Sequence, residues 1–149
     1  MPYKELLKGR TSIPGQMYLV TTVTQGRQQL FSNLQLGRLI VREIREFETK
    51  QIAQTLAFVV MPDHLHWLMR INNHQTLSNL VRLFKGRTAR AVNVVQQRQG
   101  PVWQHGFHDH AVRIDESLVE IARYVIMNPV RARLVEQPGD YSLWDAIWL

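Results

Sequence analysis

The stretch QTLAFVVMPDHLHWLMRI, residues 54–71, decides the fold of this chain. It holds two runs rich in β-branched, aromatic and other apolar residues, Gln54–Met61 and His64–Ile71, on either side of the pair Pro62-Asp63. Proline followed by aspartate is typical of a tight turn. The stretch therefore predicts two antiparallel strands joined as a hairpin.

The two faces of the second strand differ in chemistry. Every second residue from Leu65 to Ile71 is apolar, which predicts the face that packs against the core. His64, His66 and Arg70 point to the other side, in a polar row that only Leu68 interrupts. Two imidazoles on one face of a strand can reach one cation, although an isolated His-x-His pair more often binds nothing.

Outward from the hairpin, the pattern predicts two more strands and three helices. The strands are Met17–Thr24 and Gly106–Ile114. The first helix follows the capping-box sequence Ser32–Gln35, the second begins at Thr76 and stops before Gly100-Pro101, and the third begins at Asp115 and ends at Pro129. This order predicts an α+β fold: a ferredoxin-like antiparallel sheet with two helices on one face and an added C-terminal helix.

Length and composition restrict the classes of protein to which the chain could belong. A chain of 149 residues without repeats or linkers predicts one domain, residues 1–149, with residues 130–149 as a tail that packs back on it. No stretch is apolar enough for a membrane span, and MPYKELLKGR at the start lacks the apolar core of a signal peptide, so a cytoplasmic protein is expected. The absence of cysteine excludes disulfides, thiolate zinc sites and cysteine catalysis. The formal net charge of +6 favours a polyanionic partner.

The third predicted helix carries another candidate pair. Tyr124 and Asn128 lie four residues apart, so their side chains share a face of that helix. An amide oxygen is a suitable hard ligand for a divalent cation. Taken alone, however, Tyr124 is an ordinary half-buried aromatic residue and Asn128 an ordinary helix end. Periodicity does not bring either of them to the histidines.

Two motifs, in this order, carry a resemblance to a known family. Val60–His66, VMPDHLH, resembles the His-hydrophobic-His (HUH) signature of single-tyrosine transposases, usually VMPNHVH. Tyr124–Val135, YVIMNPVRARLV, is similar to the tyrosine-helix motif of the REP-associated tyrosine transposases, and Trp103–His110 resembles the tract before the last strand in that branch. The chain departs from the family at Asp63, usually Asn, and at Arg133, commonly Gly. Neither position is expected to carry the chemistry.

The resemblance implies a metal-dependent transposase that nicks and rejoins single-stranded hairpin DNA of the REP kind. Tyr124 on the added helix would be the nucleophile and would form a covalent 5′-phosphotyrosine link. His64, His66 and Asn128 would hold a divalent ion, Mg²⁺ or Mn²⁺. His108 and His110, a second pair on the last predicted strand, are weak candidates for an accessory base. The protein would act as a monomer or a homodimer.

A set of cations is expected to bind the DNA backbone. Its members lie on the second predicted helix or flank the first strand: Arg10, Arg27, Arg82, Lys85, Arg87 and Arg90. A solvated helix face explains the helix residues equally well.

Two other functions stay open on the same fold. A non-catalytic nucleic-acid-binding domain, either a domesticated transposase or an RRM-like module, would need stacking aromatic residues on the exposed face of the sheet, which the strands do not clearly show. A metal-dependent hydrolase would use water in place of Tyr124. A zinc nucleobase deaminase is excluded because the chain has no cysteine.

Overall fold

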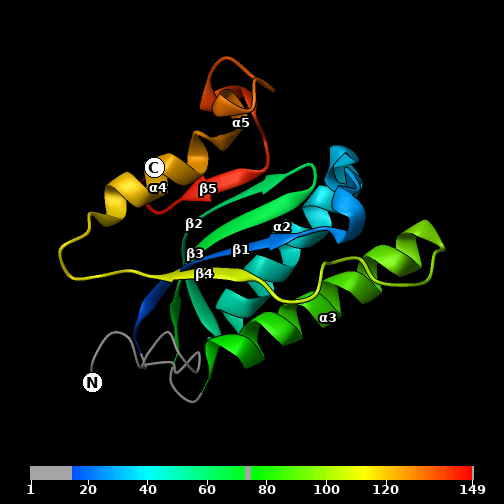
Figure 1. The fold of residues 1–149 in the computed structure, drawn as a ribbon, viewed down its shortest axis with the longest axis horizontal. Helices are drawn as coiled ribbons and strands as arrows, with labels where there is room; N and C mark the ends of the chain where they lie inside the picture. Colours follow the sequence, from blue (N-terminus) through cyan, green and yellow to red (C-terminus); the bar gives the residue numbers. More distant parts are fainter. Residues whose placement is uncertain (1–14, 73–74, 149) are drawn as a thin grey trace.

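A five-stranded antiparallel sheet forms the centre of the molecule (Figure 1). The computed structural model describes residues 15–72 and 75–148. The strands are β1 (Met17–Val23), β2 (Ala53–Met61), β3 (His64–Ile71), β4 (His108–Ala111) and β5 (Trp144–Ala146), in the spatial order β4-β1-β3-β2-β5. Each neighbouring pair is antiparallel, and β2 and β3 form the hairpin that residues 54–71 predict.

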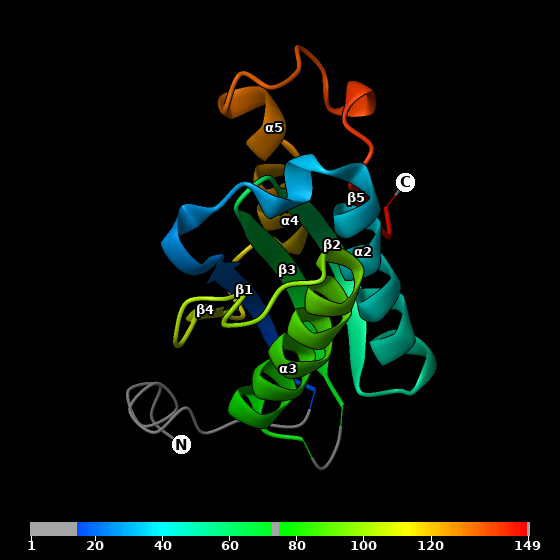
Figure 2. The same ribbon diagram turned by 90° about the vertical axis from the view of Figure 1, so that its right-hand side faces the viewer.

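Helices cover both faces of the sheet. They are α2 (Leu34–Thr49), α3 (Leu77–Gln96), α4 (Leu118–Ile126) and α5 (Asn128–Arg131), with short 3-10 helices η1 (Gln25–Arg27), η2 (Leu30–Ser32) and η3 (Pro138–Asp140). Figure 2 shows α2 and α3 on one side of the sheet and α4 behind it. The α+β class is confirmed. None of the described helices is long and apolar enough to cross a membrane.

The larger core lies between the sheet and the two helices α2 and α3. Trp67, on the predicted apolar face of β3, is 1% exposed, and its ring lies 6.0 Å from that of Phe47 in α2 and 4.8 Å from that of Phe84 in α3. The indole nitrogen donates to the hydroxyl of Thr55 at 3.0 Å, so its only polar atom has a partner. Truncating a buried aromatic residue typically costs about 3–5 kcal/mol. This cluster therefore holds both helices against the strand.

The opposite face has a smaller core of its own. Leu68, which interrupts the polar row of β3, is fully buried there with Ala122 and Val125 of α4. The expectation of a polar face is thus right only for the start of β3, where His64 and His66 lie, and for exposed Arg70 at its end. Because α4 packs on this face, the third predicted helix lies on the histidine side of the sheet.

Several predicted boundaries are wrong by a few residues. Asn33, not Ser32, caps α2, because its side chain accepts the backbone N–H two residues on at 2.9 Å, while Ser32 ends η2. Ser117, not Asp115, caps α4 by accepting the backbone N–H three residues on at 3.2 Å. The strand predicted at Gly106–Ile114 is confined to β4, because the register with β1 covers those four residues alone among the described ones.

The C-terminal segment adds an edge strand that no pattern in the sequence predicts, so the four-stranded expectation needs correction. β5 pairs with β2 and covers the edge that β2 would otherwise leave open. Just before it, Leu143 enters the larger core against Gly37 of α2, and the Tyr141 hydroxyl donates to the backbone carbonyl of Val60. These contacts anchor residues 141–146 to the domain.

Candidate functional site

His64 and His66 lie together at the start of β3, with ring centroids 4.8 Å apart and ring planes at 85°. The Nδ1 atom of His64 lies 2.6 Å from Oδ1 of Asp63, and the Nδ1 atom of His66 lies 2.8 Å from Oγ1 of Thr21. No described residue bonds the Nε2 atom of either ring. The two Nε2 atoms are therefore the ones available for a shared ligand.

The partner of His64 determines which nitrogen carries its proton. An ionised carboxylate only accepts, so Nδ1 of neutral His64 donates and its Nε2 carries the lone pair. Burial alone raises the pKa of Asp63, but hydrogen bonds and charge from His64 and Arg27 outweigh burial, and the pKa is lowered. Metal-ligating histidines commonly donate their second ring nitrogen to such a carboxylate. The hydroxyl of Thr21 can accept from His66 in the same way.

His66 is held in its neutral form. Burial lowers its pKa to about 4, with smaller electrostatic contributions from His64 and Arg131. A neutral imidazole near pH 7 is the form that binds a metal ion. Arg131 belongs to α5, so its effect on His66 also indicates that the end of the α4–α5 segment lies within electrostatic reach of the histidines.

Tyr124 projects from α4 into solvent. It is 55% exposed, whereas Ala122 and Val125 on the other side of the helix are buried. The guanidinium carbon of Arg131 lies 3.9 Å from the centroid of the Tyr124 ring, and Nη2 of Arg131 donates to the Tyr124 carbonyl at 2.5 Å. Sequence reasoning missed Arg131. Arg131 lies beyond Pro129, where the predicted helix ends, so helical spacing gave no signal for it.

Asn128 is the first residue of α5, not part of the helix of Tyr124 as predicted. α4 ends at Ile126, and the Asn128 side-chain nitrogen donates to the carbonyls of Val125 at 3.0 Å and Tyr124 at 3.3 Å. The amide thus closes the end of α4 and stays next to the tyrosine. Its Oδ1 accepts no hydrogen bond from the residues that the structure describes, and no hydrogen bond among them joins Asn128 to either histidine.

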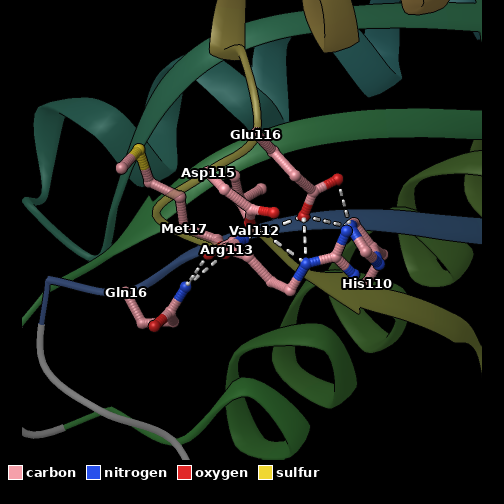
Figure 3. A network of polar contacts seen from close by, with 7 residues as sticks. All are labelled: Gln16, Met17, His110, Val112, Arg113, Asp115 and Glu116. Atoms are coloured by element: carbon pink, nitrogen blue, oxygen red, sulfur yellow. Dashed lines mark hydrogen bonds and ion pairs between the residues drawn. The ribbon is translucent and has the colours of Figure 1, made fainter. Parts of the chain in front are cut away.

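A polar network fixes the linker between β4 and α4 (Figure 3). The His110 Nε2 atom lies 2.8 and 2.9 Å from the two oxygens of Glu116, and the backbone N–H of Arg113 donates to the same carboxylate at 2.9 Å. Gln16 joins the linker to β1 by donating to the carbonyl of Val112 at 2.9 Å. His110, one of the two accessory candidates, is therefore engaged in positioning the helix that carries Tyr124.

His108, the other accessory candidate, faces the histidine side of the sheet. Thr21 pairs with His66 on one side and with His108 on the other, and directly paired residues point to the same face. A hollow of about 200 Å³ lies here, lined by Thr21, Val23 and the loop from Gln104 to His108. Because Val23 pairs with His64 across the strands, the hollow adjoins the histidine pair.

The predicted DNA-binding cations are not gathered at this site. Arg10 lies outside the described residues. Arg27 lies near the histidines, where it pairs with Asp63 at 3.2 Å. Lys85 donates to the carbonyls of Gln104 and Gly106 at 2.6 Å each, and burial lowers its pKa. Lys85 therefore anchors the loop beside the hollow.

The remaining arginines of α3 lie on the opposite side of the sheet from the histidines. Arg82 bonds within its own helix, and Arg87 pairs with Glu43 of α2 through two bonds of 2.8 and 3.3 Å. Arg90 lines a groove of about 480 Å³ between α2 and α3, together with Arg42. These side chains reach a different face of the molecule from Tyr124.

The donor set is incomplete, so a divalent cation bound here would take further ligands from elsewhere. The described residues contain no group of three or more His, Cys, Asp or Glu side chains that could hold a metal ion. The fitting donors are the two Nε2 atoms, to which an amide oxygen, water and phosphate oxygens would be added. Two oriented imidazoles could hold part of the coordination shell of a divalent cation.

Several known proteins are similar to this chain in sequence and in fold. Residues 12–128 match the family model described as "Transposase IS200 like". A Haemophilus influenzae protein described as a candidate REP-associated tyrosine transposase is 26% identical over 144 residues, which cover 85% of this chain and 77% of that one. A solved REP-associated tyrosine transposase bound to a REP hairpin is similar in structure, with a TM-score of 0.70 and 24% identity over 89% of this chain and 77% of that one. A candidate transposase from Deinococcus radiodurans has a TM-score of 0.58 and 21% identity over 79% and 94% of the two chains.

Proposed function

The chain belongs to the IS200-like transposase family, and from this premise we propose that it nicks and rejoins single-stranded DNA through a covalent bond to Tyr124. One observation carries the proposal. α4, which bears Tyr124, packs on the face of the sheet that bears His64 and His66, and Arg131 contacts the tyrosine while its charge acts on His66. This arrangement supports one site made of both sequence motifs.

In the proposed reaction the Tyr124 oxygen attacks the phosphorus of the scissile phosphodiester. A bond forms between the tyrosine oxygen and phosphorus, and the bond from phosphorus to the 3′ oxygen of the preceding nucleotide breaks. The phenol gives up its proton and the departing 3′ oxygen gains one. The products are a 5′-phosphotyrosine and a 3′-hydroxyl. A second 3′-hydroxyl can reverse the step and join strands without a nucleotide cofactor.

The histidine pair would hold the metal ion. His64 and His66 would bind Mg²⁺ or Mn²⁺ through Nε2, and the Oδ1 atom of Asn128 would be the third protein ligand. When bound, the ion would supply neutralisation of charge on the phosphate oxygens and orientation of the phosphorus. Asp63 and Thr21 support this role because each holds the Nδ1 atom of one ring.

Hairpin DNA is the proposed substrate. The similar solved protein that is described as bound to a REP hairpin supports this choice, and the net charge of +6 agrees with a polyanionic ligand. Because α4 packs on the sheet of its own chain, we propose that the nucleophile and the histidines act within one molecule.

The test uses labelled hairpin-bearing single-stranded DNA with Mn²⁺, and the readout is a protein–DNA adduct that survives denaturation. The wild type should form the adduct, and Tyr124→Phe should not. Tyr141→Phe is the matched control, since Tyr141 lies in the anchored C-terminal segment and should leave the adduct unchanged. His64→Ala should lose cleavage while hairpin affinity persists. Cleavage without an adduct would indicate a hydrolase, and hairpin binding without cleavage a non-catalytic domain.

A further inference from the structure

Arg131 lies beside Tyr124, the proposed nucleophile. Its guanidinium stacks on the Tyr124 ring at 3.9 Å, which holds the planar group beside the side chain that would attack. Nη2 of Arg131 also donates to the Tyr124 carbonyl at 2.5 Å, so two contacts keep this side chain beside the tyrosine. Arg131 is therefore a cation in direct contact with the proposed nucleophile.

Most of the hydrogen-bonding capacity of Arg131 is unused. A guanidinium has five N–H donors, and the described residues take one of them, through the bond from Nη2 to the Tyr124 carbonyl. The guanidinium carbon lies over the Tyr124 ring, and the other N–H groups have no hydrogen-bond partner among the described residues. The side chain is exposed, so these N–H groups are accessible to a ligand. Lys85 and Arg87 differ, because protein partners occupy them.

We propose that Arg131 is a catalytic residue, whose guanidinium edge binds a non-bridging oxygen of the scissile phosphate during attack by Tyr124. This inference rests on the proposed function. An attacked phosphodiester gains negative charge on its oxygens, and donors already placed where that charge develops lower the barrier. The forked guanidinium matches two phosphate oxygens at once, which a lysine does not.

The site needs the positive charge of Arg131 because its other protein groups offer the phosphate little positive charge. The positive end of Arg27 is paired with Asp63 at 3.2 Å. Arg82, Arg87 and Arg90 belong to α3, on the other face of the sheet. Apart from the metal ion, Arg131 is therefore the cation best placed to meet the phosphate beside Tyr124.

A purely structural role makes different predictions. The bond from Arg131 to the Tyr124 carbonyl caps the end of α4, where a cation is favourable in any case. Loss of such a cap would lower thermal stability and loosen the helix. Lysine at this position would restore most of the cap, and no small molecule would replace it. A role in phosphate binding instead demands a guanidinium group.

The experiment measures single-turnover adduct formation on hairpin DNA with Mn²⁺ for the wild type, Arg131→Ala and Arg131→Lys. Arg123→Ala is the matched control, because Arg123 is an exposed arginine of α4, the helix that carries Tyr124, and its loss removes the same charge. Thermal unfolding, Mn²⁺ affinity and hairpin affinity are measured for each variant in parallel. Free guanidinium ion at millimolar concentration is then added to Arg131→Ala and to Tyr124→Phe.

Arg131→Ala should slow adduct formation by about 100- to 1,000-fold, the usual effect of losing one preorganised donor. Mn²⁺ affinity and folding should persist, Arg131→Lys should recover only part of the rate, and guanidinium should accelerate Arg131→Ala but not Tyr124→Phe. An unchanged rate in Arg131→Ala, or full recovery in Arg131→Lys without a response to guanidinium, would overturn the proposal. A wild type that forms no adduct would overturn the proposed function and this inference together. An active wild type with an active Arg131→Ala would overturn the inference alone.

Discussion

Replacing Asp63 by alanine tests how His64 is prepared for a metal ion. The change removes the acceptor that lies 2.6 Å from Nδ1 of His64, so the ring can rotate or move its proton to Nε2, the atom that would bind the ion. Loss of such a partner typically weakens metal binding by about 10- to 100-fold. This corresponds to about 1.4–2.7 kcal/mol, within the range expected for one hydrogen bond to a charged group, about 1.5–3 kcal/mol.

The ion pair between Asp63 and Arg27 contributes little to this loss of metal-binding free energy. Arg27 is 66% exposed in its pair with Asp63, and exposed ion pairs are worth at most about 1 kcal/mol. Arg27→Ala therefore serves as the matched control, because it removes the ion pair and leaves the bond to His64. Asp63→Asn keeps a neutral acceptor, restores the residue that is usual in the family, and should lose much less affinity than Asp63→Ala.

The assay is Mn²⁺ titration of the DNA-free protein by electron paramagnetic resonance, with ¹⁵N chemical shifts of the His64 ring to report its protonated nitrogen. Asp63→Ala should bind Mn²⁺ more weakly and lose the preference for a proton on Nδ1. Equal losses in Asp63→Ala and Arg27→Ala would refute the reasoning, since the ion pair and not the histidine bond would then matter. Unchanged Mn²⁺ affinity with a changed tautomer would show that His64 is not a ligand.

Three other properties follow from the structure. As pH falls from about 6.5 to about 4, unfolded His66 takes up a proton that the folded ring does not, so the free energy of unfolding should decrease. In chemical denaturation without metal, the free energy of unfolding of His66→Gln should fall less steeply with decreasing pH than that of the wild type. An equal dependence on pH in the two proteins would contradict the lowered pKa of His66. Lys85→Met should lower the free energy of unfolding by about 1–3 kcal/mol, because Lys85 bonds two loop carbonyls, with little change in the salt dependence of DNA binding; unchanged stability with a reduced salt dependence would place DNA at Lys85. Gly37→Ala should cost about 1–3 kcal/mol in denaturation, because the new methyl group meets the buried side chain of Leu143; unchanged stability would mean that the C-terminal segment repacks freely.

Strand alternation alone placed the residues of β3 on their correct faces. Trp67 and its apolar neighbours had to point away from His64 and His66, because side chains alternate along a strand whatever the rest of the chain does. The same local physics predicted the hairpin and the two helices over the larger core. The family resemblance linked Tyr124 to the histidines, whereas spacing alone did not.

Local sequence patterns predicted less well where two similar residues could each cap a helix, and where an element is short. Asn33 and Ser117 cap helices that Ser32 and Asp115 were expected to cap, because the backbone direction at each turn decides which side chain meets the free N–H groups. β5 has only three residues and gains its stability from pairing with β2, a partner more than 80 residues earlier in the chain. No window of sequence contains that pairing.

Only the tertiary structure decided what surrounds the candidate site. It showed that α4 covers the histidine face, that Asp63 holds His64, and that Arg131 lies against Tyr124. It also showed that Lys85, expected to bind DNA, instead bonds the backbone of a loop. The physical reason is that periodicity reports which face of an element is apolar, while the partner of each polar group depends on which distant element packs against it.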